Sequence, residues 1–279
     1  MPVVPVLDST MHYEQSGTTP IVFLHGNPSS SHAWRHVLPE LGGLAPDLIG
    51  MGRSGKPDIA YSFADHARYL DAWFDAVGLD RVVLVGHDWG GALAFDWAAR
   101  HPDRVLGVVF FETVVKPMTG SELPLPAQER LRRFRAASAL DDDAFIRQAY
   151  TGGVLSPVSD DDLATYLAPF PDAVSRRPVL AWAKQMPFDG SPAELIPRIE
   201  AYDAWLRESQ VPKLLLTFEG SPTLLIGPAL QVWCEQNIAA LDVVAVGEAG
   251  HHAQEDRPKE IAAEIAAWTE HHGLVAQRA

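Results

Sequence analysis

The sequence is poor in cysteine. It has a single one, Cys234, among 279 residues, so no disulfide can form within the chain, and an oxidising compartment is neither required nor excluded. Cys234 stands in an apolar stretch with a helical pattern. Buried packing is the more common role of a cysteine in such a place, and a reactive thiol is the alternative.

The sequence is also short of basic residues and of long apolar runs. Lysine and arginine number 22 against 36 aspartates and glutamates, a formal net charge of −14. Nucleic acids and anionic membranes attract basic surfaces, so neither is expected as a partner. The first nine residues lack the basic start of a signal peptide, and no run of 18 uncharged apolar residues could span a bilayer. We therefore expect a cytoplasmic protein, either a monomer or a homo-oligomer.

What the chain does contain is a regular succession of apolar runs and helical patterns. Runs without alternation suit strands that are buried on both faces, as in a parallel sheet covered by helices. Between them, Ser62 and Asp65 predict a capping box opening a helix that Gly78 ends, and Pro258 suits the start of a last helix through His271. The pattern indicates a doubly wound or related parallel α/β fold. The predicted strands are 21–25, 81–85, 105–111, 213–218 and 242–246.

The segment 117–210 breaks this rhythm. It has no strong strand pattern, and helical patterns occur at 127–139, 143–150, 160–167 and 193–206. We interpret it as a helical cap inserted into a main domain formed by 1–116 and 211–279. The acidic runs 141–143 and 160–162 are interpreted as helix N-terminal charges on a solvated surface. Three consecutive residues cannot all face one ion, so no metal site is expected there.

The strongest local signal is the segment Gly86-His87-Asp88-Trp89-Gly90-Gly91, which follows an apolar run and opens a helical pattern. This is the context of the nucleophile elbow of α/β-hydrolases, with aspartate where serine usually stands. A carboxylate needs no base to activate it. Asp88 therefore indicates displacement of a leaving group from saturated carbon, as in haloalkanes or epoxides, followed by hydrolysis of an alkyl ester. A simple helix cap is the alternative, but it does not explain the flanking glycines.

A general base must come from elsewhere in the chain. The pair His251-His252 lies just after the last predicted strand, where α/β-hydrolases carry their histidine. The usual chain order of nucleophile, acid and histidine is obeyed if the acid is Glu112, at the end of the third apolar run. Glu219, after the fourth run, occupies the other common position of the acid.

Several stretches of the chain match the pattern of one family. They are His25-Gly26-Asn27-Pro28, Asp47-Leu48-Ile49-Gly50-Met51-Gly52, the elbow itself, Arg177-Pro178 with Trp182 and Pro187, and Gln254-Glu255-Asp256. Together they resemble the haloalkane dehalogenases over nearly the full length of the chain. The similarity is greatest to the subfamily with an Asp-His-Glu triad. The resemblance implies an α/β-hydrolase fold with a mostly parallel central sheet, helices on both faces and an inserted helical cap.

The resemblance also implies roles for individual residues. Asp88 falls on the nucleophile, Glu112 on the catalytic acid and His251 on the base. Asn27 and Trp89 fall on the pair that binds the leaving halide, and their backbone N–H groups on the oxyanion hole. Neutral N–H donors suit a developing anion because they stabilise it without the fixed charge that would trap the product.

Two features concern the cap and its surroundings. Phe134, Phe145 and Pro187 match cap residues that line the halide pocket, with simple core packing as the alternative. The stretch Leu38–Asp47 is shorter than in the family, which predicts a truncated strand or a shortened helix, and Lys116–Asp143 is compressed. These departures concern the shape of the tunnel and the range of substrates, and they leave Asp88 and Trp89 unaffected.

The expected reaction converts a haloalkane and water to alcohol, halide and a proton, without a cofactor or metal. An epoxide hydrolase of the same fold is the nearest rival; it would need two cap tyrosines, for which Tyr150 and Tyr166 are available. A coelenterazine-type luciferase keeps the same triad and Asn-Trp pair, so motifs do not separate it. A binding protein without turnover is disfavoured, because it would have no need of the whole set of five residues.

Overall fold

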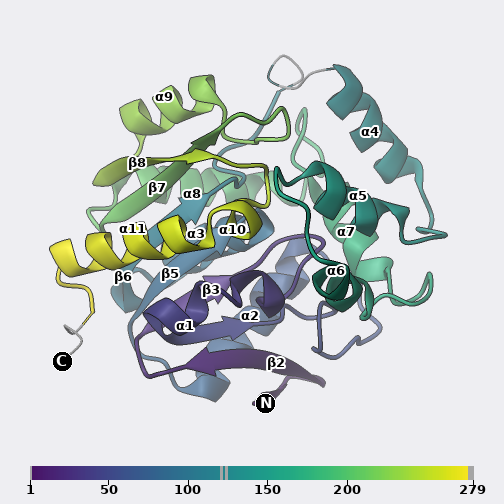
Figure 1. The fold of residues 1–279 in the computed structure, drawn as a ribbon, viewed down its shortest axis with the longest axis horizontal. Helices are drawn as coiled ribbons and strands as arrows, with labels where there is room; N and C mark the ends of the chain where they lie inside the picture. Colours follow the sequence, from purple (N-terminus) through teal and green to yellow (C-terminus); the bar gives the residue numbers. More distant parts are fainter. Residues whose placement is uncertain (1, 120–121, 123–124, 276–279) are drawn as a thin grey trace.

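The fold is built on one sheet in the computed structural model of the chain, which describes residues 2–119, 122 and 125–275. Its eight strands lie in the order β1-β2-β4-β3-β5-β6-β7-β8 (Figure 1). The pairs β1–β2 and β2–β4 are antiparallel, and the remaining pairs are parallel. The strands are β1 (Val3–Val6), β2 (Ser9–Ser16), β3 (Ile21–Leu24), β4 (Gly43–Pro46), β5 (Val82–His87), β6 (Val105–Phe111), β7 (Lys213–Glu219) and β8 (Leu241–Glu248).

Helices connect the strands and cover both faces of the sheet. They are α1 (Leu38–Leu41), α2 (Phe63–Val77), α3 (Trp89–Arg100), α4 (Leu125–Ala136), α5 (Ala144–Gly152), α6 (Asp160–Leu167), α7 (Arg177–Gln185), α8 (Ile196–Glu208), α9 (Pro228–Asn237), α10 (Ala253–Asp256) and α11 (Pro258–His271), with 3-10 turns η1 (Ser31–Trp34) and η2 (Pro102–Arg104). In Figure 1, α1 and α11 lie on the near side of the sheet.

The two faces of the sheet bury two separate apolar clusters. Alternate side chains of β5 show the division: Leu84 packs in the cluster with α2, α3 and α8, whereas Val83 and Val85 pack in the cluster with α1 and α11. Successive residues of a strand point to opposite faces, so a strand that is apolar at every position is buried on both. This confirms the interpretation of the continuous apolar runs for β3, β5, β6 and β7. It was wrong for β8, an edge strand in which no residue is fully buried.

The predicted boundaries of several elements are confirmed. The five predicted strands are present as β3, β5, β6, β7 and β8. At the start of α2, the Ser62 hydroxyl accepts from the Asp65 N–H at 3.1 Å, and the Asp65 carboxylate accepts from the Ser62 N–H at 3.0 Å. Gly78 ends this helix with a φ of 68°, a left-handed conformation that suits glycine. The last helix begins at Pro258 and ends at His271.

In the shortened stretch before Asp47, both the helix and the strand are short. Helix α1 and strand β4 have four residues each, and only Gly42 separates them. Gly42 and Gly43 have φ values of 73° and 119°, and a Cβ on Gly43 would lie 2.3 Å from the carbonyl oxygen of Ile21. Two glycines thus allow the chain to turn from helix to strand without a loop.

The segment between β6 and β7 holds the helices predicted for the cap and one more. Helix α7 was not predicted as an element. Helices α4 to α7 gather at one side of the molecule (Figure 1). Helix α8, in contrast, packs against α3, and its Tyr202 hydroxyl donates to the carbonyl of Val114 at 2.7 Å. Within the proposed cap 117–210, α8 therefore covers a face of the sheet. Residues 120–121 and 123–124 of the compressed early cap lie outside the described residues.

The acidic runs stand at helix starts, as predicted, but one member turns inward. Asp160–Asp162 form the first turn of α6, where the Ser159 hydroxyl accepts from the Asp162 N–H. The Asp162 carboxylate lies 2.7 Å from His32 Nε2 and 3.0 Å from Arg35 Nε. The interpretation as a purely solvated surface was therefore wrong for Asp162. Within the described ranges, no three side chains are grouped so as to hold a metal ion, and no helix could cross a membrane.

Candidate active site

The nucleophile elbow is the junction between β5 and α3. Asp88 stands there with a φ of 51° and a ψ of −128°, a strained conformation for a residue with a side chain. The flanking glycines are needed because of close packing. A Cβ on Gly86 would lie 2.4 Å from the Cα of Gly91, and one on Gly90 would lie 2.1 Å from the carbonyl oxygen of Leu24. Helix packing against the sheet therefore explains the glycine spacing in the sequence.

The strained turn is held by neighbouring loops. The Asn27 N–H donates to Asp88 Oδ1 at 2.7 Å, and the Thr113 hydroxyl donates to the Asp88 carbonyl at 2.6 Å. The carboxylate is 5% exposed. One of its oxygens is thus fixed by a backbone donor, which leaves Oδ2 as the oxygen that faces other groups. The backbone N–H of Trp89, the other predicted donor of the oxyanion hole, makes no hydrogen bond to the Asp88 carboxylate in the part of the chain that the structure describes.

The predicted base and acid meet at the elbow. His251 Nε2 lies 3.5 Å from Asp88 Oδ2, and His251 Nδ1 lies 3.2 Å from Glu112 Oε2. Glu112 is 1% exposed, and its carboxylate also accepts the N–H groups of Leu225 at 2.6 Å and Ile226 at 3.2 Å. These donors satisfy a buried charge. Glu219, the alternative acid, is exposed at the end of β7.

Electrostatics couple the three residues. Burial alone would raise the pKa of Asp88, but the hydrogen bond and the positive charge of His251 outweigh it and lower this pKa. Burial alone would lower the pKa of His251, but hydrogen bonds and charges of Asp88 and Glu112 outweigh it and raise the pKa to about 9. Asp88 is therefore ionised at neutral pH, and the imidazole is held as a cation between two carboxylates.

The predicted halide pair lies beside the nucleophile. Asn27 and Trp89 both line the same cavity as Asp88. The side-chain amide of Asn27 donates one N–H to the carbonyl of Val179 at 3.2 Å. This bond orients the amide, and its second N–H is not used by that contact. The indole of Trp89 stacks on that of Trp182 with ring centroids 4.8 Å apart and planes 24° apart. This stack fixes the direction of the indole N–H of Trp89.

The cavity has a volume of about 250 Å³. Phe134 and Phe145 line it and pack edge to face with centroids 5.0 Å apart. Pro187 is buried, but it is not among the residues that line the cavity. The structure thus brings the triad, the Asn-Trp pair and two of the three suggested cap residues to one place. The other residues that line it are Pro28, Arg130, Leu131, Gln148, Ala149, Gly152, Gly153, Trp182, Ala183, Met186, Thr223, Leu225 and His252.

Sequence reasoning missed the residues that hold the backbone carbonyl of His251 in place. His87 Nε2 lies 2.7 Å from the carbonyl oxygen of His251, and Gln254 Nε2 lies 3.2 Å from His87 Nδ1. Gln254 can only donate from its amide nitrogen, so His87 Nδ1 accepts and His87 Nε2 donates. Burial, together with the charges of His251 and His252, lowers the pKa of His87 well below its usual range, which keeps it neutral.

The loop that carries His251 is also bound to the proposed cap. The Asp256 carboxylate accepts the N–H groups of Gly250, Leu155 and Ser156 at 2.8 to 3.0 Å. A Cβ on Gly250 would lie 2.3 Å from the carbonyl oxygen of Gly153, and that same oxygen accepts the N–H of His252 at 2.8 Å. The base is therefore positioned partly by the segment that follows α5.

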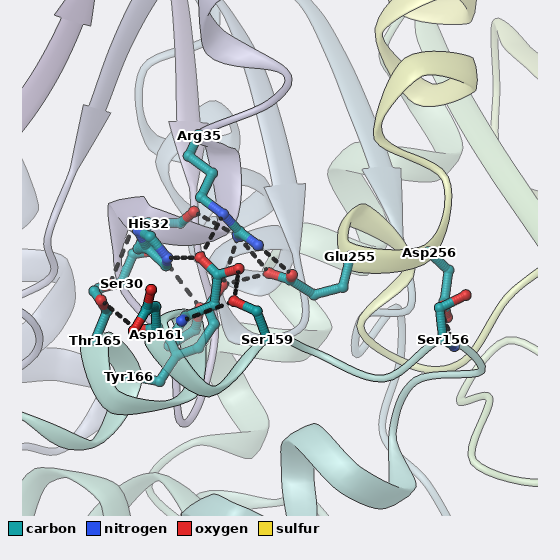
Figure 2. A network of polar contacts seen from close by, with 12 residues as sticks. Ser30, His32, Arg35, Ser156, Ser159, Asp161, Thr165, Tyr166, Glu255 and Asp256 are labelled. Carbon is teal, nitrogen blue, oxygen red and sulfur yellow. Dashed lines mark hydrogen bonds and ion pairs between the residues drawn. The ribbon is translucent and has the colours of Figure 1, made fainter.

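A second set of contacts fastens α6 to the same loop. The Arg35 guanidinium donates to both oxygens of Glu255, at 2.8 and 2.7 Å, and lies 3.0 Å from Asp162 through Nε. The Tyr166 hydroxyl of α6 donates to Glu255 as well. Figure 2 shows Arg35, Tyr166 and Glu255 converging in this network. Three segments far apart in the sequence are thereby joined beside the active site: η1, α6 and α10.

A mostly parallel sheet covered by helices, with a nucleophile on a strained strand-to-helix turn and a histidine after the last strand, defines the α/β-hydrolase class. The family model described as "alpha/beta hydrolase fold" matches residues 19–258.

Comparisons with known proteins narrow the class. The haloalkane dehalogenase of Mesorhizobium japonicum is 42% identical over 95% of this chain and 89% of its own. The crystal structure of haloalkane dehalogenase DbeA from Bradyrhizobium elkani superimposes with a TM-score of 0.92, 39% identity and 98% of each chain covered. That of DatA from Agrobacterium tumefaciens gives 0.88, 38% identity and coverage of 97% of this chain and 96% of that chain. This chain belongs to the haloalkane dehalogenase family.

Proposed function

We propose that this protein hydrolyses the carbon–halogen bond of haloalkanes through a covalent ester on Asp88. The observation that carries the proposal is the arrangement of that carboxylate. One oxygen is fixed by the Asn27 N–H, and the other faces both the cavity and His251. The substrate class is a halogenated alkane small enough for a cavity of about 250 Å³. Water is the second reactant and halide a product.

In the first step, Asp88 Oδ2 attacks the carbon that carries the halogen. A C–O bond forms as the C–halogen bond breaks, and the electron pair leaves with the halide. Asn27 and Trp89 line the cavity beside the carboxylate, so their N–H groups can stabilise the departing anion. The aspartate is ionised without help from a base, because its pKa is lowered.

In the second step, water attacks the ester carbonyl. The carbonyl oxygen is Oδ1, which the Asn27 N–H already holds, and that N–H stabilises the negative charge that develops there. His251 takes the proton from water, and Glu112 orients the ring and stabilises the imidazolium. The tetrahedral intermediate then collapses: the bond between the Asp88 carbonyl carbon and the alkyl oxygen breaks, the alkoxide takes the proton from His251 and leaves as the alcohol, and the Asp88 carboxyl returns its proton to His251. Alkylation turns Asp88 into a neutral ester. One of the two charges that raise the pKa of His251 is then lost, so the imidazolium gives its proton to solvent and the neutral ring can act as a base.

The proposal is tested by halide release from 1-bromobutane. Wild-type protein should release bromide and protons in equal amounts, and Asp88→Ala should release none. His251→Phe should release at most one bromide per protein, and mass spectrometry should find a butyl group on Asp88, because the ester forms but is not hydrolysed. Release by a folded Asp88→Ala variant, or a His251→Phe variant without the adduct, would overturn the covalent route.

The tyrosines required by an epoxide hydrolase are turned away from the reaction. Tyr150 donates its hydroxyl to the carbonyl of Pro28 at 2.8 Å, and Tyr166 donates to Glu255. Neither is among the residues that line the cavity. Protonation of an epoxide oxygen needs a donor in the cavity, so this arrangement favours halide as the leaving group.

A further inference from the structure

His252 is a buried polar residue in the cavity wall that the proposed mechanism does not use. Its side chain is 2% exposed and lines the cavity. The ring stacks on that of Tyr150, with centroids 4.7 Å apart and planes 22° apart, and its centroid lies 5.1 Å from that of His251. The imidazole is therefore held in a fixed orientation next to the base.

The two ring nitrogens of His252 have different surroundings. Nδ1 is buried and lacks a hydrogen-bond partner within the described ranges. Nε2 is not sealed in this way, so it is the nitrogen that can meet the contents of the cavity. A polar atom beside an apolar space gains from a partner, and here the partner must come from the cavity itself.

The ring is neutral, and its proton can be placed. Burial lowers the pKa of His252 well below its usual range, and the charge of His251 lowers it further. A neutral imidazole has one N–H donor and one bare nitrogen. A buried donor without a partner is rarer in proteins than a buried acceptor without one. We therefore assign the bare nitrogen to the sealed Nδ1 and the N–H to Nε2.

Much of the wall around this donor is apolar. Besides the triad and the Asn-Trp pair, the other residues with polar side chains that line the cavity are Arg130, Gln148 and Thr223. Beside the apolar part of the wall an N–H group discriminates between ligands, because a ligand atom that accepts from it replaces water and an alkyl group does not. The apolar residues that line the cavity include Leu131, Phe134, Phe145, Trp182, Met186 and Leu225.

We propose that His252 is a specificity-determining residue, whose Nε2–H forms a subsite for a hydrogen-bond acceptor carried by the substrate. The preferred substrates are then haloalkanes with a nitrile, ether or carbonyl group a few bonds from the halogen, rather than plain haloalkanes. This inference rests on the proposed dehalogenase function and names the substrates of that same site.

The experiment compares 4-bromobutyronitrile with 1-bromopentane, which have equal numbers of non-hydrogen atoms. We expect His252→Phe, which keeps an aromatic ring on Tyr150, to lower the nitrile-to-pentane ratio of kcat/KM by about tenfold, the worth of one hydrogen bond. Phe134→Leu is the matched control: it alters the same cavity without changing a polar group, so rates change and the ratio does not. A ratio that is equal in wild type and His252→Phe would overturn the subsite.

A second pair of variants covers the case of an inactive His252→Phe protein. His252→Gln keeps an N–H donor and His252→Leu removes it at a similar size, so the ratio should be higher for Gln than for Leu. Equal ratios, or loss of turnover in all three variants, would show a role in the fold or in catalysis instead of selectivity. Absence of turnover of both substrates by wild-type protein would overturn the proposed function itself.

Discussion

Asp88 and Glu112 share a feature that is rare for residues with side chains: both have a positive φ, of 51° and 48°. Each such position costs on the order of 1 to 3 kcal/mol and persists only where the surroundings hold it. Here the surroundings are hydrogen bonds, from Asn27 to Asp88 and from Leu225 and Ile226 to Glu112. The strain lifts both carboxylates off the strand ends towards the same imidazole.

The closeness of Gly26 to the nucleophile gives a first prediction. A Cβ on Gly26 would lie 2.1 Å from Asp88 Oδ1, so Gly26→Ala should displace the carboxylate. Misplacing a reacting group by about 1 Å can cost about 100-fold in rate, and we expect a loss of kcat/KM of at least that size. Bromide release from 1-bromobutane measures it. Gly227→Ala, at a position that does not line the cavity and whose Cβ would meet nothing within 4 Å, should stay within a few-fold of wild type.

His251 gives a prediction for stability against pH. Its pKa rises from 6.5 to about 9 on folding. The folded state therefore binds the proton more tightly, and the stability this contributes is fully present below pH 6.5 and lost as pH rises through about 9. Between pH 6.5 and 9.5 the free energy of unfolding should fall more steeply for wild type than for His251→Gln, as urea titrations would measure. Equal slopes would contradict the assignment.

At this scale the motif pattern predicted which residues meet at the elbow, but it did not predict the details of their contacts. The elbow and the order of acid and base led to Asp88, Glu112 and His251, which the structure brings together. Pro187 shows the limit: its position in the chain follows a family pattern, but it is not among the residues that line the cavity. His87 shows another, because the bond to the His251 carbonyl depends on tertiary approach that no local pattern records.

At the scale of elements, the sequence predicted the strands that contain a continuous apolar run and missed β1, β2 and β4, which do not. Strands β1 and β4 have four residues each, and β1 contains Pro5. Strand β2 has only two buried residues, Met11 and His12, which are adjacent, and no continuous apolar run marks it. The signal for a buried parallel strand is absent from all three, although pairing with neighbours makes them strands.

The junction of η1, α6 and α10 gives a prediction at this scale. The Glu255 side chain is 5% exposed, and Arg35 is the cation that pairs with it. Arg35→Ala leaves that carboxylate buried without a counter-charge, and we expect the free energy of unfolding to fall by about 3 kcal/mol. The control is Arg177→Ala, which breaks an ion pair to Asp58 whose side chains are 48% and 91% exposed. It should cost less than about 1 kcal/mol.

A loss in Arg35→Ala no larger than that in Arg177→Ala, measured by urea unfolding, would contradict this account of the junction. A change in turnover is a further readout. The same loop carries His251, and loosening α10 should slow hydrolysis of the ester more than its formation. Pre-steady-state bromide bursts separate the two steps.

The whole molecule carries a net charge of −14, which repels itself in the compact state. Raising ionic strength from 0.01 to 0.15 M shortens the screening length from about 30 Å to about 8 Å. We expect Tm to rise over this range. The salt should be sodium acetate, since chloride and bromide are ligands of the proposed halide site. A Tm that falls or stays constant would show that ion pairs such as Arg35–Glu255 outweigh the general repulsion.

The contact between Gly250 and Gly153 bears on how such enzymes can be recombined. The carbonyl of Gly153 occupies the space where a side chain on Gly250 would stand, and it accepts the His252 N–H. The shapes of the two loops therefore depend on each other. A chimera that takes residues 117–210 from a relative has a different loop at Gly153, and the position of His251 then depends on that loop. Exchanging residues 249–256 together with 117–210 keeps the two contacting loops from one parent. Chimeras that take both segments from the same relative should therefore retain turnover more often than chimeras that take 117–210 alone.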